Sequence, residues 1–309
     1  MSEIDILVAG GGLAGLTAGL QAARLGRRCT VFTGHVPGGL LLSIESVQGL
    51  PGHADGIAGY DLCPMTQEQA MDAGAQCIAG EVVSLAPGDG CWRIEASEGP
   101  HRARSVILAS GCHLKTLGIP GEERLRGKGV SHCASCDAPL LRNRTVAVIG
   151  SGDAACQEAL TLAAHAAQVH LLHLGAALRA QDRWQRRIKT QRNVVLHPNS
   201  LVDEIVGEQA VRALRVRDAV DGTAAELFVD AVFIYVGLAP NTRFLGDLLP
   251  LDAEGRLPAD GSLRCARRGL FAAGSVRAGS CGQAVGAASD GVRAAFAAHR
   301  FLDDGAWPG

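Results

Sequence analysis

Apolar and polar positions repeat one pattern twice along the chain: a short apolar run, a glycine-rich turn and an amphipathic helix. The first copy starts with residues 4–9, an apolar run typical of a buried parallel strand. From Leu13 to Ala23 apolar residues recur at helical spacing, and Gly26 is suited to end that helix. Residues 28–32 form the next apolar run. This order predicts a β-α-β unit at the start of the chain.

The second copy lies in the middle of the chain. Residues 145–149 predict a strand, residues 154–164 a helix, and residues 169–173 a second strand. Two such units in one chain are much more specific than one. We therefore expect an α/β fold with two parallel sheets.

The remaining segments complete these two units. Residues 61–73 predict a helix, and a last helix with one apolar face starts near residue 283. Residues 115–129 are rich in glycine and are typical of a linker. Further strands are predicted at residues 81–85, 91–96, 103–108, 194–196, 211–216 and 227–235, and from residue 270.

Both glycine-rich turns match a dinucleotide-binding pattern. Residues 10–15 fit G-x-G-x-x-G, and residues 150–155 fit G-x-G-x-x-A. In such turns the first glycine makes the bend, the second lets a pyrophosphate approach, and the helix N-terminus faces the phosphates. The candidate ligand-binding positions are Gly10, Gly12, Leu13, Ala14, Gly15, Gly150, Gly152, Asp153 and Ala155.

One part of the first pattern is missing. An acid that holds a ribose is expected about 20 residues after the turn, but the second strand ends in Phe32-Thr33-Gly34-His35. The alternative interpretation is a tight turn without a ligand. The intact β-α-β context favours a bound dinucleotide.

Composition excludes several classes of protein. The 309 residues are 47% hydrophobic and carry a net charge of −2, so a nucleic-acid partner is not expected. The most apolar stretch, residues 159–178, contains His165, His170 and His173 and is not expected to span a membrane. No export signal is recognised, so a cytoplasmic protein with mostly reduced cysteines is expected.

A dithiol motif lies between the two nucleotide-binding patterns, in Cys133-Ala134-Ser135-Cys136-Asp137. In this context it indicates an electron path from a pyridine nucleotide through a flavin to a disulfide. The alternative is a zinc site shared with Cys112, His113 or His132, but the second ligand pair that zinc needs is absent. We therefore expect no bound metal.

At this point a family resemblance is evident. From residue 4 to about residue 301 the chain resembles the low-molecular-weight thioredoxin reductases and related flavin-dependent dithiol oxidoreductases. The matching motifs, in order, are Gly10–Gly15, Thr33-Gly34 with Gly38-Gly39, Cys133–Asp137, Gly150–Ala155, Val236-Gly237 to Pro240-Asn241-Thr242, and Ala272-Ala273-Gly274 with Gln283-Ala284.

The resemblance implies two Rossmann-like domains of three-layer ββα type, one inserted in the other. The discontinuous FAD domain would comprise residues 1–116 and 246–309, and the NAD(P)H domain with the dithiol residues 117–245. A homodimer would be usual. The positions implied to contact cofactors are Thr33, Gly38, Gly39, Leu40, Leu41, Val83, Ser110, Gly111, Gly274, Ser275, Gln283 and Ala284 for FAD, and His173 and Arg179 for the pyridine nucleotide.

The resemblance also implies roles for the dithiol. Cys136 would face the flavin, Cys133 would attack an external disulfide, and Asp137 would donate and accept protons. Physical chemistry agrees with these roles. A thiolate is the attacking species in disulfide exchange, and a neighbouring carboxyl group can move the protons.

Three departures from the family pattern affect the cofactors. Two arginines that neutralise the 2′-phosphate of NADPH are replaced by Leu174 and Gly175, and only Arg179 keeps its place. Nearby arginines at 183, 186 and 187 either substitute or form a solvated helix face. On the FAD side, Ser275 replaces an acid and Gly282 an arginine, and Gly49 stands where asparagine is usual. NADPH or NADH therefore remains open as the donor.

We expect first a reductase that passes electrons from a pyridine nucleotide through FAD to the dithiol and on to a thioredoxin-like protein. The second hypothesis is a dithiol oxidase that closes a disulfide in a small natural product, with oxygen or NADP⁺ as acceptor. A donor such as ferredoxin is a further alternative, and so is a flavin-bound redox sensor without turnover. The intact residues 150–155 favour the reductase.

Overall fold

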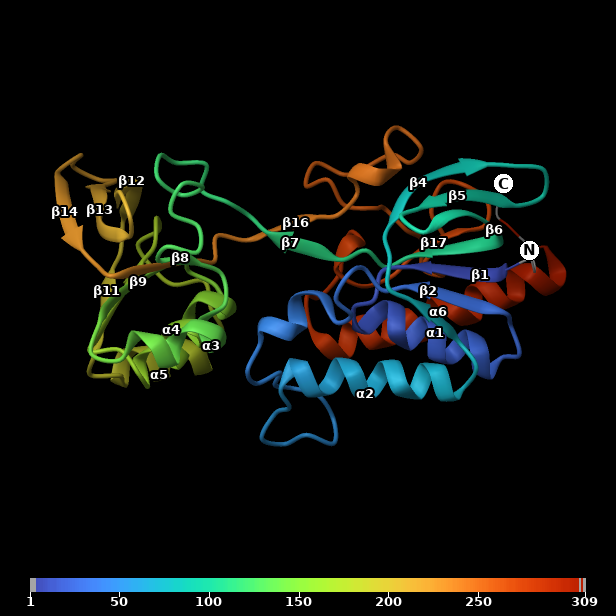
Figure 1. Ribbon diagram of the computed structural model, residues 1–309, viewed down its shortest axis with the longest axis horizontal. Coiled ribbons are helices and arrows are strands. Elements are labelled where there is room, and N and C mark those ends of the chain that lie inside the picture. The colour runs from blue at the N-terminus through green and yellow to red at the C-terminus, as the bar shows by residue number, and fades with distance from the viewer. Residues whose placement is uncertain (1–3, 306, 308–309) are drawn as a thin grey trace. The chain divides into compact units, whose positions relative to one another are not determined.

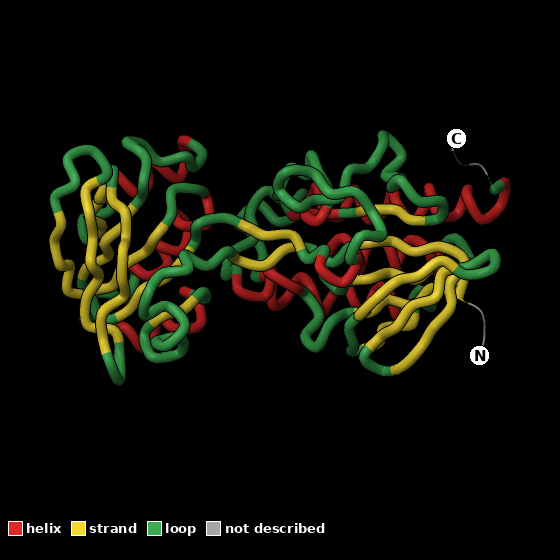
Figure 2. The backbone as a smooth tube through the Cα atoms, turned by 90° about the horizontal axis from the view of Figure 1, so that it is seen from above, coloured by secondary structure: helices red, strands yellow, loops and turns green. Residues whose placement is uncertain are grey.

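A computed structural model describes residues 4–305 and 307 of the chain (Figure 1). The chain divides into two compact units, one formed by the residues up to 113 and from 239 onward, the other by residues 114–238. Both units contain helices and strands (Figure 2). The chain changes unit a few residues before the expected boundaries at 116/117 and 245/246, within the paired strands β7 and β16, which comprise Cys112–Leu114 and Leu238–Pro240.

The first unit is built on a seven-stranded sheet. Strands β3, β2, β1, β6 and β17 are parallel, and β4 and β5 extend the sheet antiparallel to β6. The strands are β1 Ile4–Ala9, β2 Cys29–Phe32, β3 Gln76–Ile78, β4 Val82–Pro87, β5 Trp92–Ala96, β6 Gly99–Leu108 and β17 Leu270–Ala272.

Alternate residues of β1 serve two different cores. Ile6 and Val8 pack in the core that contains helix residues, whereas Leu7 and Ala9 pack in the core on the other face of the sheet. The run is therefore apolar on both faces apart from Asp5, which pairs with Arg28 and Arg104, because a central parallel strand is buried on both faces. The helical segments of this unit are α1 Leu13–Arg24, α2 Gly59–Asp72 and α6 Ala284–Asp304, with 3₁₀ turns η1 Gly39–Ser43, η3 Arg243–Leu245 and η4 Gly274–Val276.

Helices α1 and α6 lie side by side (Figure 1), although they come from the two ends of the chain. Small residues make the contact possible. A Cβ added at Gly291 would lie 2.3 Å from the Ala14 carbonyl oxygen, so only glycine fits there without displacing α1.

The second unit contains a five-stranded parallel sheet in the order β11-β10-β9-β15-β8, and an antiparallel sheet in the order β12-β13-β14. The strands are β8 Val130–Ser131, β9 Thr145–Ile149, β10 Gln168–Leu172, β11 Val194–His197, β12 Ser200–Gly207, β13 Val211–Asp218, β14 Ala224–Phe228 and β15 Ala231–Ile234. The helical segments are α3 Ala134–Asp137, η2 Ala138–Leu141, α4 Asp153–Ala163 and α5 Asp182–Thr190.

Both predicted β-α-β units are present, as β1-α1-β2 and β9-α4-β10. The single strand predicted over residues 227–235 is wrong. Strand β14 ends at Phe228 in the antiparallel sheet, and β15 starts at Ala231 in the parallel sheet. Between them the Asp230 amide donates to the Thr145 carbonyl at 2.7 Å, and Asp230, the charged residue that interrupts this apolar run, lies where the chain changes sheets. The strand β12 was not predicted, because its buried positions 202 and 205 do not alternate regularly.

No helix among the described residues is long and apolar enough to cross a lipid bilayer.

Candidate functional site

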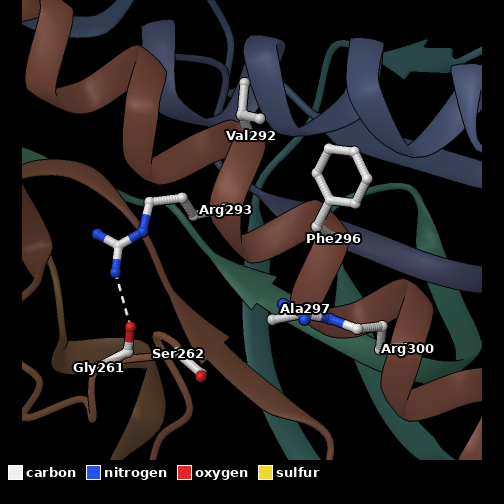
Figure 3. A pocket seen from close by; sticks show the side chains of 7 residues that line it. All are labelled: Gly261, Ser262, Val292, Arg293, Phe296, Ala297 and Arg300. Atoms are coloured by element: carbon white, nitrogen blue, oxygen red, sulfur yellow. Dashed lines mark hydrogen bonds between the residues drawn. The ribbon is translucent and has the colours of Figure 1, made fainter.

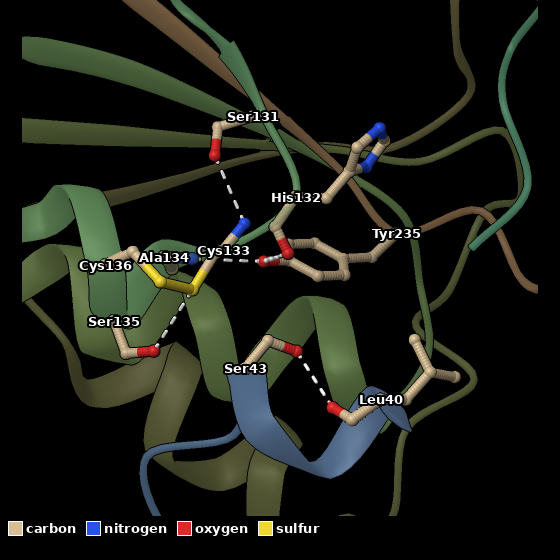
Figure 4. Close-up of a disulfide and its surroundings, with 9 residues drawn as sticks. All are labelled: Leu40, Ser43, Ser131, His132, Cys133, Ala134, Ser135, Cys136 and Tyr235. Carbon is tan, nitrogen blue, oxygen red and sulfur yellow. Dashed lines mark hydrogen bonds between the residues drawn. A yellow bond between two sulfur atoms is a disulfide. The ribbon is translucent and has the colours of Figure 1, made fainter. Parts of the chain in front are cut away.

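Cys133 and Cys136 form a disulfide, and their Cα atoms lie 5.3 Å apart (Figure 4). Cys133 caps the short helix α3, and Cys136 lies within its single turn. A spacing of three residues places both side chains on one side of a helical turn, which is what a disulfide within a turn requires. Cys136 is exposed and Cys133 is half-buried. The disulfide of this pair is therefore accessible within its own unit.

The turn around Cys133 is held by hydroxyl groups. The Cys133 amide donates to the Ser131 hydroxyl at 3.2 Å. The Ala134 amide donates to the Tyr235 hydroxyl at 3.3 Å, and this hydroxyl donates to the His132 carbonyl at 3.1 Å (Figure 4). Sequence reasoning assigned Tyr235 only to the end of a strand. No local pattern identifies it, because its partners lie about a hundred residues away.

Burial strongly raises the pKa of Tyr235, and the negative charges of Glu158 and Asp137 raise it further. The Tyr235 hydroxyl is therefore protonated at neutral pH, and it remains able to donate a hydrogen bond. Asp137, the predicted proton donor, ends α3 and is half-buried, with its amide donating to the Cys133 carbonyl at 3.3 Å. The turn thus carries the dithiol and the carboxyl group together.

The residues of the zinc alternative are occupied elsewhere. The Cys112 thiol donates to the Ser275 carbonyl, His113 contacts Asn241, and His132 contacts the Ile234 carbonyl. Within residues 4–305 and 307, no group of three or more His, Cys, Asp or Glu side chains is arranged to hold a metal ion.

The first glycine-rich turn has the geometry of a phosphate cradle. Gly10 has φ of +125°, and a Cβ on it would lie 2.2 Å from the Ala109 carbonyl oxygen. Gly12 caps α1, and a Cβ on it would meet no atom within 4 Å. The helix N-terminus therefore faces open space, as pyrophosphate binding requires. The residues of this turn fit FAD.

Other predicted FAD positions gather around this turn. Gly38 directly precedes η1, and its amide donates to the Gly11 carbonyl at 2.8 Å. The predicted positions Gly39, Leu40 and Leu41 lie within η1. A Cβ on Gly274 would lie 2.8 Å from the Ala14 Cβ, and one on Gly111 would lie 3.7 Å from the Ser275 hydroxyl. Thr33 is buried at the end of β2, Ser110 follows β6, and Gln283 caps α6, whose first residue is Ala284. Val83 is 57% exposed and lies at a register shift of β4.

A buried ion pair supports the Gly274 turn and was missed from the sequence. Asp290 on α6 is 4% exposed, and its carboxylate accepts the Gly274 amide at 3.1 Å. The Arg277 guanidinium donates to both Asp290 oxygens, at 3.0 and 3.2 Å. The sequence held one signal for this ion pair, an acid inside the last helix close to the predicted apolar positions, because a buried acid needs a partner.

The second glycine-rich turn repeats the geometry of the first. Gly150 has φ of +149°, and a Cβ on it would lie 2.3 Å from the Tyr235 carbonyl oxygen. Gly152 caps α4 and again faces open space, while Ala155 is fully buried beneath the turn. Asp153 does not point freely into that space, because its carboxylate accepts the Gln181 amide at 2.8 Å. The turn itself fits a pyrophosphate.

The strand end after β10, which the sequence predicts to select between nucleotides, carries few charges. His173 is buried, and burial lowers its pKa, so it supplies no positive charge at neutral pH. Leu174 is 62% exposed. Arg179 is exposed, and its amide donates to the Ser151 carbonyl at 2.8 Å. The guanidinium groups of Arg183 and Arg187 lie 4.8 and 5.2 Å from the Trp184 ring centre, so both contact this ring.

A separate pocket of about 280 Å³ lies along α6 (Figure 3). Arg293 donates from its guanidinium to the Gly261 carbonyl at 2.7 Å at this pocket. None of the predicted site residues lines it. The lining residues are Gly261, Ser262, Val292, Arg293, Phe296, Ala297 and Arg300.

A family model described as pyridine nucleotide-disulphide oxidoreductase matches residues 4–291. The chain belongs to this family. Among curated members it is 37% identical to a thioredoxin reductase of Treponema pallidum over 302 residues, covering 98% of both chains. The crystal structure of Lactococcus lactis thioredoxin reductase shares a TM-score of 0.95 and 31% identity, covering 98% of this chain and 100% of that one. The crystal structure of T. acidophilum thioredoxin reductase has a TM-score of 0.93 and 30% sequence identity, and the match covers 97% of this chain and 99% of that one.

Membership of the pyridine nucleotide-disulphide oxidoreductases makes the chain an FAD-dependent disulfide oxidoreductase of thioredoxin-reductase-like type. The predicted α/β fold with two Rossmann-like domains is confirmed by these structures. The Cys133–Cys136 disulfide fits the redox-active dithiol of such an enzyme.

Proposed function

We propose that the chain reduces the disulfide of a thioredoxin-like protein with electrons from a pyridine nucleotide. The observation that carries this proposal is the disulfide Cys133–Cys136 within one helical turn, in the unit that also holds the Gly150–Ala155 turn. FAD, when bound, relays the two electrons from the nucleotide to this disulfide. Relatives named thioredoxin reductase support the proposal.

The chain's own residues then perform a thiol exchange. The Cys133 thiolate attacks one sulfur of the substrate disulfide, which forms a mixed disulfide and releases a substrate thiolate. The Cys136 thiolate next attacks Cys133, which closes the disulfide again and frees the second substrate thiolate. Two protons are needed to yield the substrate dithiol, and the Asp137 carboxyl group is placed to pass them on. In sum, one nucleotide hydride and one proton reduce one substrate disulfide.

Trapping of the mixed disulfide tests this proposal and the roles of the two cysteines. The probe is a thioredoxin with its resolving cysteine replaced and its other cysteine activated as a thionitrobenzoate disulfide. Cys136→Ser should form a stable covalent complex with it, because Cys133 can attack but nothing resolves the product. Cys133→Ser should form none, and Cys281→Ser, which removes an exposed cysteine in the other unit, should behave like the parent chain. Complex formation by Cys133→Ser alone would reverse the roles.

A dithiol oxidase is the second candidate, and one observation favours it. The strand end after β10 presents Leu174 and Gly175 where a strong NADPH site would present two cations. An oxidase that uses oxygen needs no pyridine nucleotide. Anaerobic mixing with NADPH, then NADH, followed by flavin absorbance separates the two functions. Rapid flavin bleaching supports the reductase, whereas bleaching only by small dithiols supports the oxidase.

We further propose that two copies of the chain form a homodimer. Helix α2 presents apolar residues on one face, since Tyr60 is 57% exposed and Met71 is 53% exposed at a spacing of eleven residues, and the exposed Pro64 lies between them. Exposed apolar groups that line up in this way are typical of protein interfaces.

A further inference from the structure

We propose that Tyr235 is a positioning residue for the dithiol, whose hydroxyl holds the backbone on both sides of Cys133 and so sets how strongly the disulfide is favoured. The proposal rests on the proposed function only in taking Cys133 and Cys136 as the redox-active pair. It concerns one unit of the chain, residues 114–238.

The contacts are specific to Cys133. The carbonyl oxygen of the preceding residue, His132, accepts a hydrogen bond from the Tyr235 hydroxyl at 3.1 Å. The residue after it, Ala134, donates its amide to the same hydroxyl at 3.3 Å. One hydroxyl therefore acts as donor and acceptor for the two backbone groups that flank the cysteine (Figure 4).

Tyr235 is itself firmly placed. It is 8% exposed and directly follows β15, and its amide donates to the Ile149 carbonyl at 2.8 Å. Its carbonyl oxygen packs against Gly150, where a Cβ would lie only 2.3 Å away. The backbone of Tyr235 thus contacts the glycine-rich turn at Gly150, while its side chain is hydrogen-bonded to the dithiol turn. The residue is a rigid link between the two.

The hydroxyl affects the two redox states differently. While the disulfide is closed, the His132 carbonyl and Ala134 amide are held in place, and without the hydroxyl they would lose their partner. Once the disulfide is open, the turn is free to relax, and these groups can find water. Removing the hydroxyl therefore penalises the disulfide state more than the dithiol state, so it shifts the equilibrium toward the dithiol.

Tyr235→Phe tests this inference, because it removes the hydroxyl and keeps the ring. The purified full-length chain is equilibrated without nucleotide in buffers of varied ratio of reduced to oxidised dithiothreitol. Alkylation and mass spectrometry then measure the Cys133–Cys136 disulfide. We expect the equilibrium constant to shift about threefold to tenfold toward the dithiol, the range expected for net loss of one to two hydrogen bonds. A shift under twofold would overturn the proposal.

Thr190→Val is the matched control, because it removes from the same unit an exposed hydroxyl that donates to the Arg186 and Arg187 carbonyls within α5. It should leave the equilibrium unchanged, and an equal shift in this control would also overturn the proposal. A purely structural role for Tyr235 would lower the melting temperature of the variant without moving the dithiol equilibrium.

Hydrogen exchange of the parent chain gives an independent measurement if Tyr235→Phe does not fold. The Ala134 amide should be protected in the disulfide form, where the Tyr235 hydroxyl accepts it, and should exchange faster after reduction, because the opened turn can relax away from that hydroxyl. Equal protection of this amide in the two redox states would sink the inference. Neither measurement uses turnover, so a chain without reductase activity can still support the inference, and an active reductase can still refute it.

Discussion

At the scale of single residues, the end of strand β10 is where we expect the choice of pyridine nucleotide to be made. A pyrophosphate at the Gly150 turn would be held by backbone amides and a helix terminus, and both nucleotides carry this group. Only side chains near the ribose can sense the 2′-phosphate of NADPH. In this chain the exposed Leu174 and the adjacent Gly175 occupy those positions, and Arg183 and Arg187 contact Trp184. We therefore expect weak NADPH use with little preference over NADH.

Restoring the cations should restore the preference. A Cβ on Gly175 would meet only the Ala177 carbonyl oxygen, at 3.6 Å, so an arginine fits there without strain. Each charge-assisted contact to the phosphate contributes about 1.5–3 kcal/mol. Leu174→Arg with Gly175→Arg should therefore lower the KM for NADPH about a hundredfold or more and leave that for NADH unchanged.

Val220→Arg is the control for added positive charge, because Val220 is 77% exposed in the same unit but lies in the turn between β13 and β14. This variant should change neither the KM for NADPH nor the KM for NADH. If the parent chain already shows a micromolar KM for NADPH and rejects NADH, the argument from Leu174 and Gly175 is wrong, and Arg186 becomes the next cation to test.

At the scale of elements, His170 on β10, His173 directly after it and His197 on β11 form a group whose protonation should depend on folding. The His170 Nδ1 and His197 Nε2 atoms lie 2.8 Å apart, and the His173 amide donates to the His197 carbonyl at 3.0 Å. Burial is the largest cause that lowers the pKa of each, and neighbouring histidines lower those of His170 and His197 further. The folded chain therefore resists protonation at these positions.

The sign of the pH dependence follows from linkage. At about pH 7.5 and higher, well above the unfolded pKa of about 6.5, these histidines are neutral in both states and contribute no difference. At lower pH the unfolded chain binds protons at these histidines that the folded chain does not bind. The free energy of unfolding therefore falls as pH falls. The melting temperature should drop between about pH 7.5 and 5.5, and His170→Gln with His197→Gln should reduce this drop. His35→Gln, at a 75% exposed side chain, should not, and an undiminished drop in the double variant would contradict the assignment.

The two glycine-rich turns are matched elements, and one substitution in each separates their ligands. Gly12 and Gly152 both cap a helix and both face open space, so valine fits the fold there but fills the space a phosphate needs. Gly12→Val should yield a colourless chain without FAD. Gly152→Val should stay yellow with one FAD per chain, but NADPH should no longer bleach it. Absorbance spectra distinguish these outcomes, and a yellow Gly12→Val protein would refute the FAD assignment.

Much of this arrangement could be predicted from the sequence, because the β-α-β units depend on local patterns. The glycines at positions 10, 12, 150 and 152 predict both turns, and the spacing of Cys133 and Cys136 predicts the dithiol. What escaped prediction depends on distant contacts. The break at Asp230 reflects pairing with another sheet, and the roles of Tyr235 and Asp290 arise from partners that no neighbouring residue reveals.

At the scale of the whole molecule, self-association can be tested on α2. Sedimentation equilibrium should give about twice the 32.0 kDa mass of one chain. Tyr60→Asp with Met71→Asp should lower that mass toward one chain, because charge on an apolar interface opposes association. Phe228→Asp, at a 63% exposed residue in the other unit, is the control and should stay dimeric. A parent chain that sediments as a monomer would refute the dimer.

The contact between α1 and α6 also determines the order in which the chain can mature on the ribosome. The unit of residues 114–238 is continuous, so it can fold soon after its last strand emerges. The other unit must wait for β17 and α6, which are synthesised after its other elements. Until then α1 lacks its contact with α6, and β6 pairs with β1 and β5 but lacks β17. Nascent chains stalled before residue 270 should therefore protect the inserted unit from protease while the first hundred residues are cut. Equal protection of both segments would disprove this order of maturation.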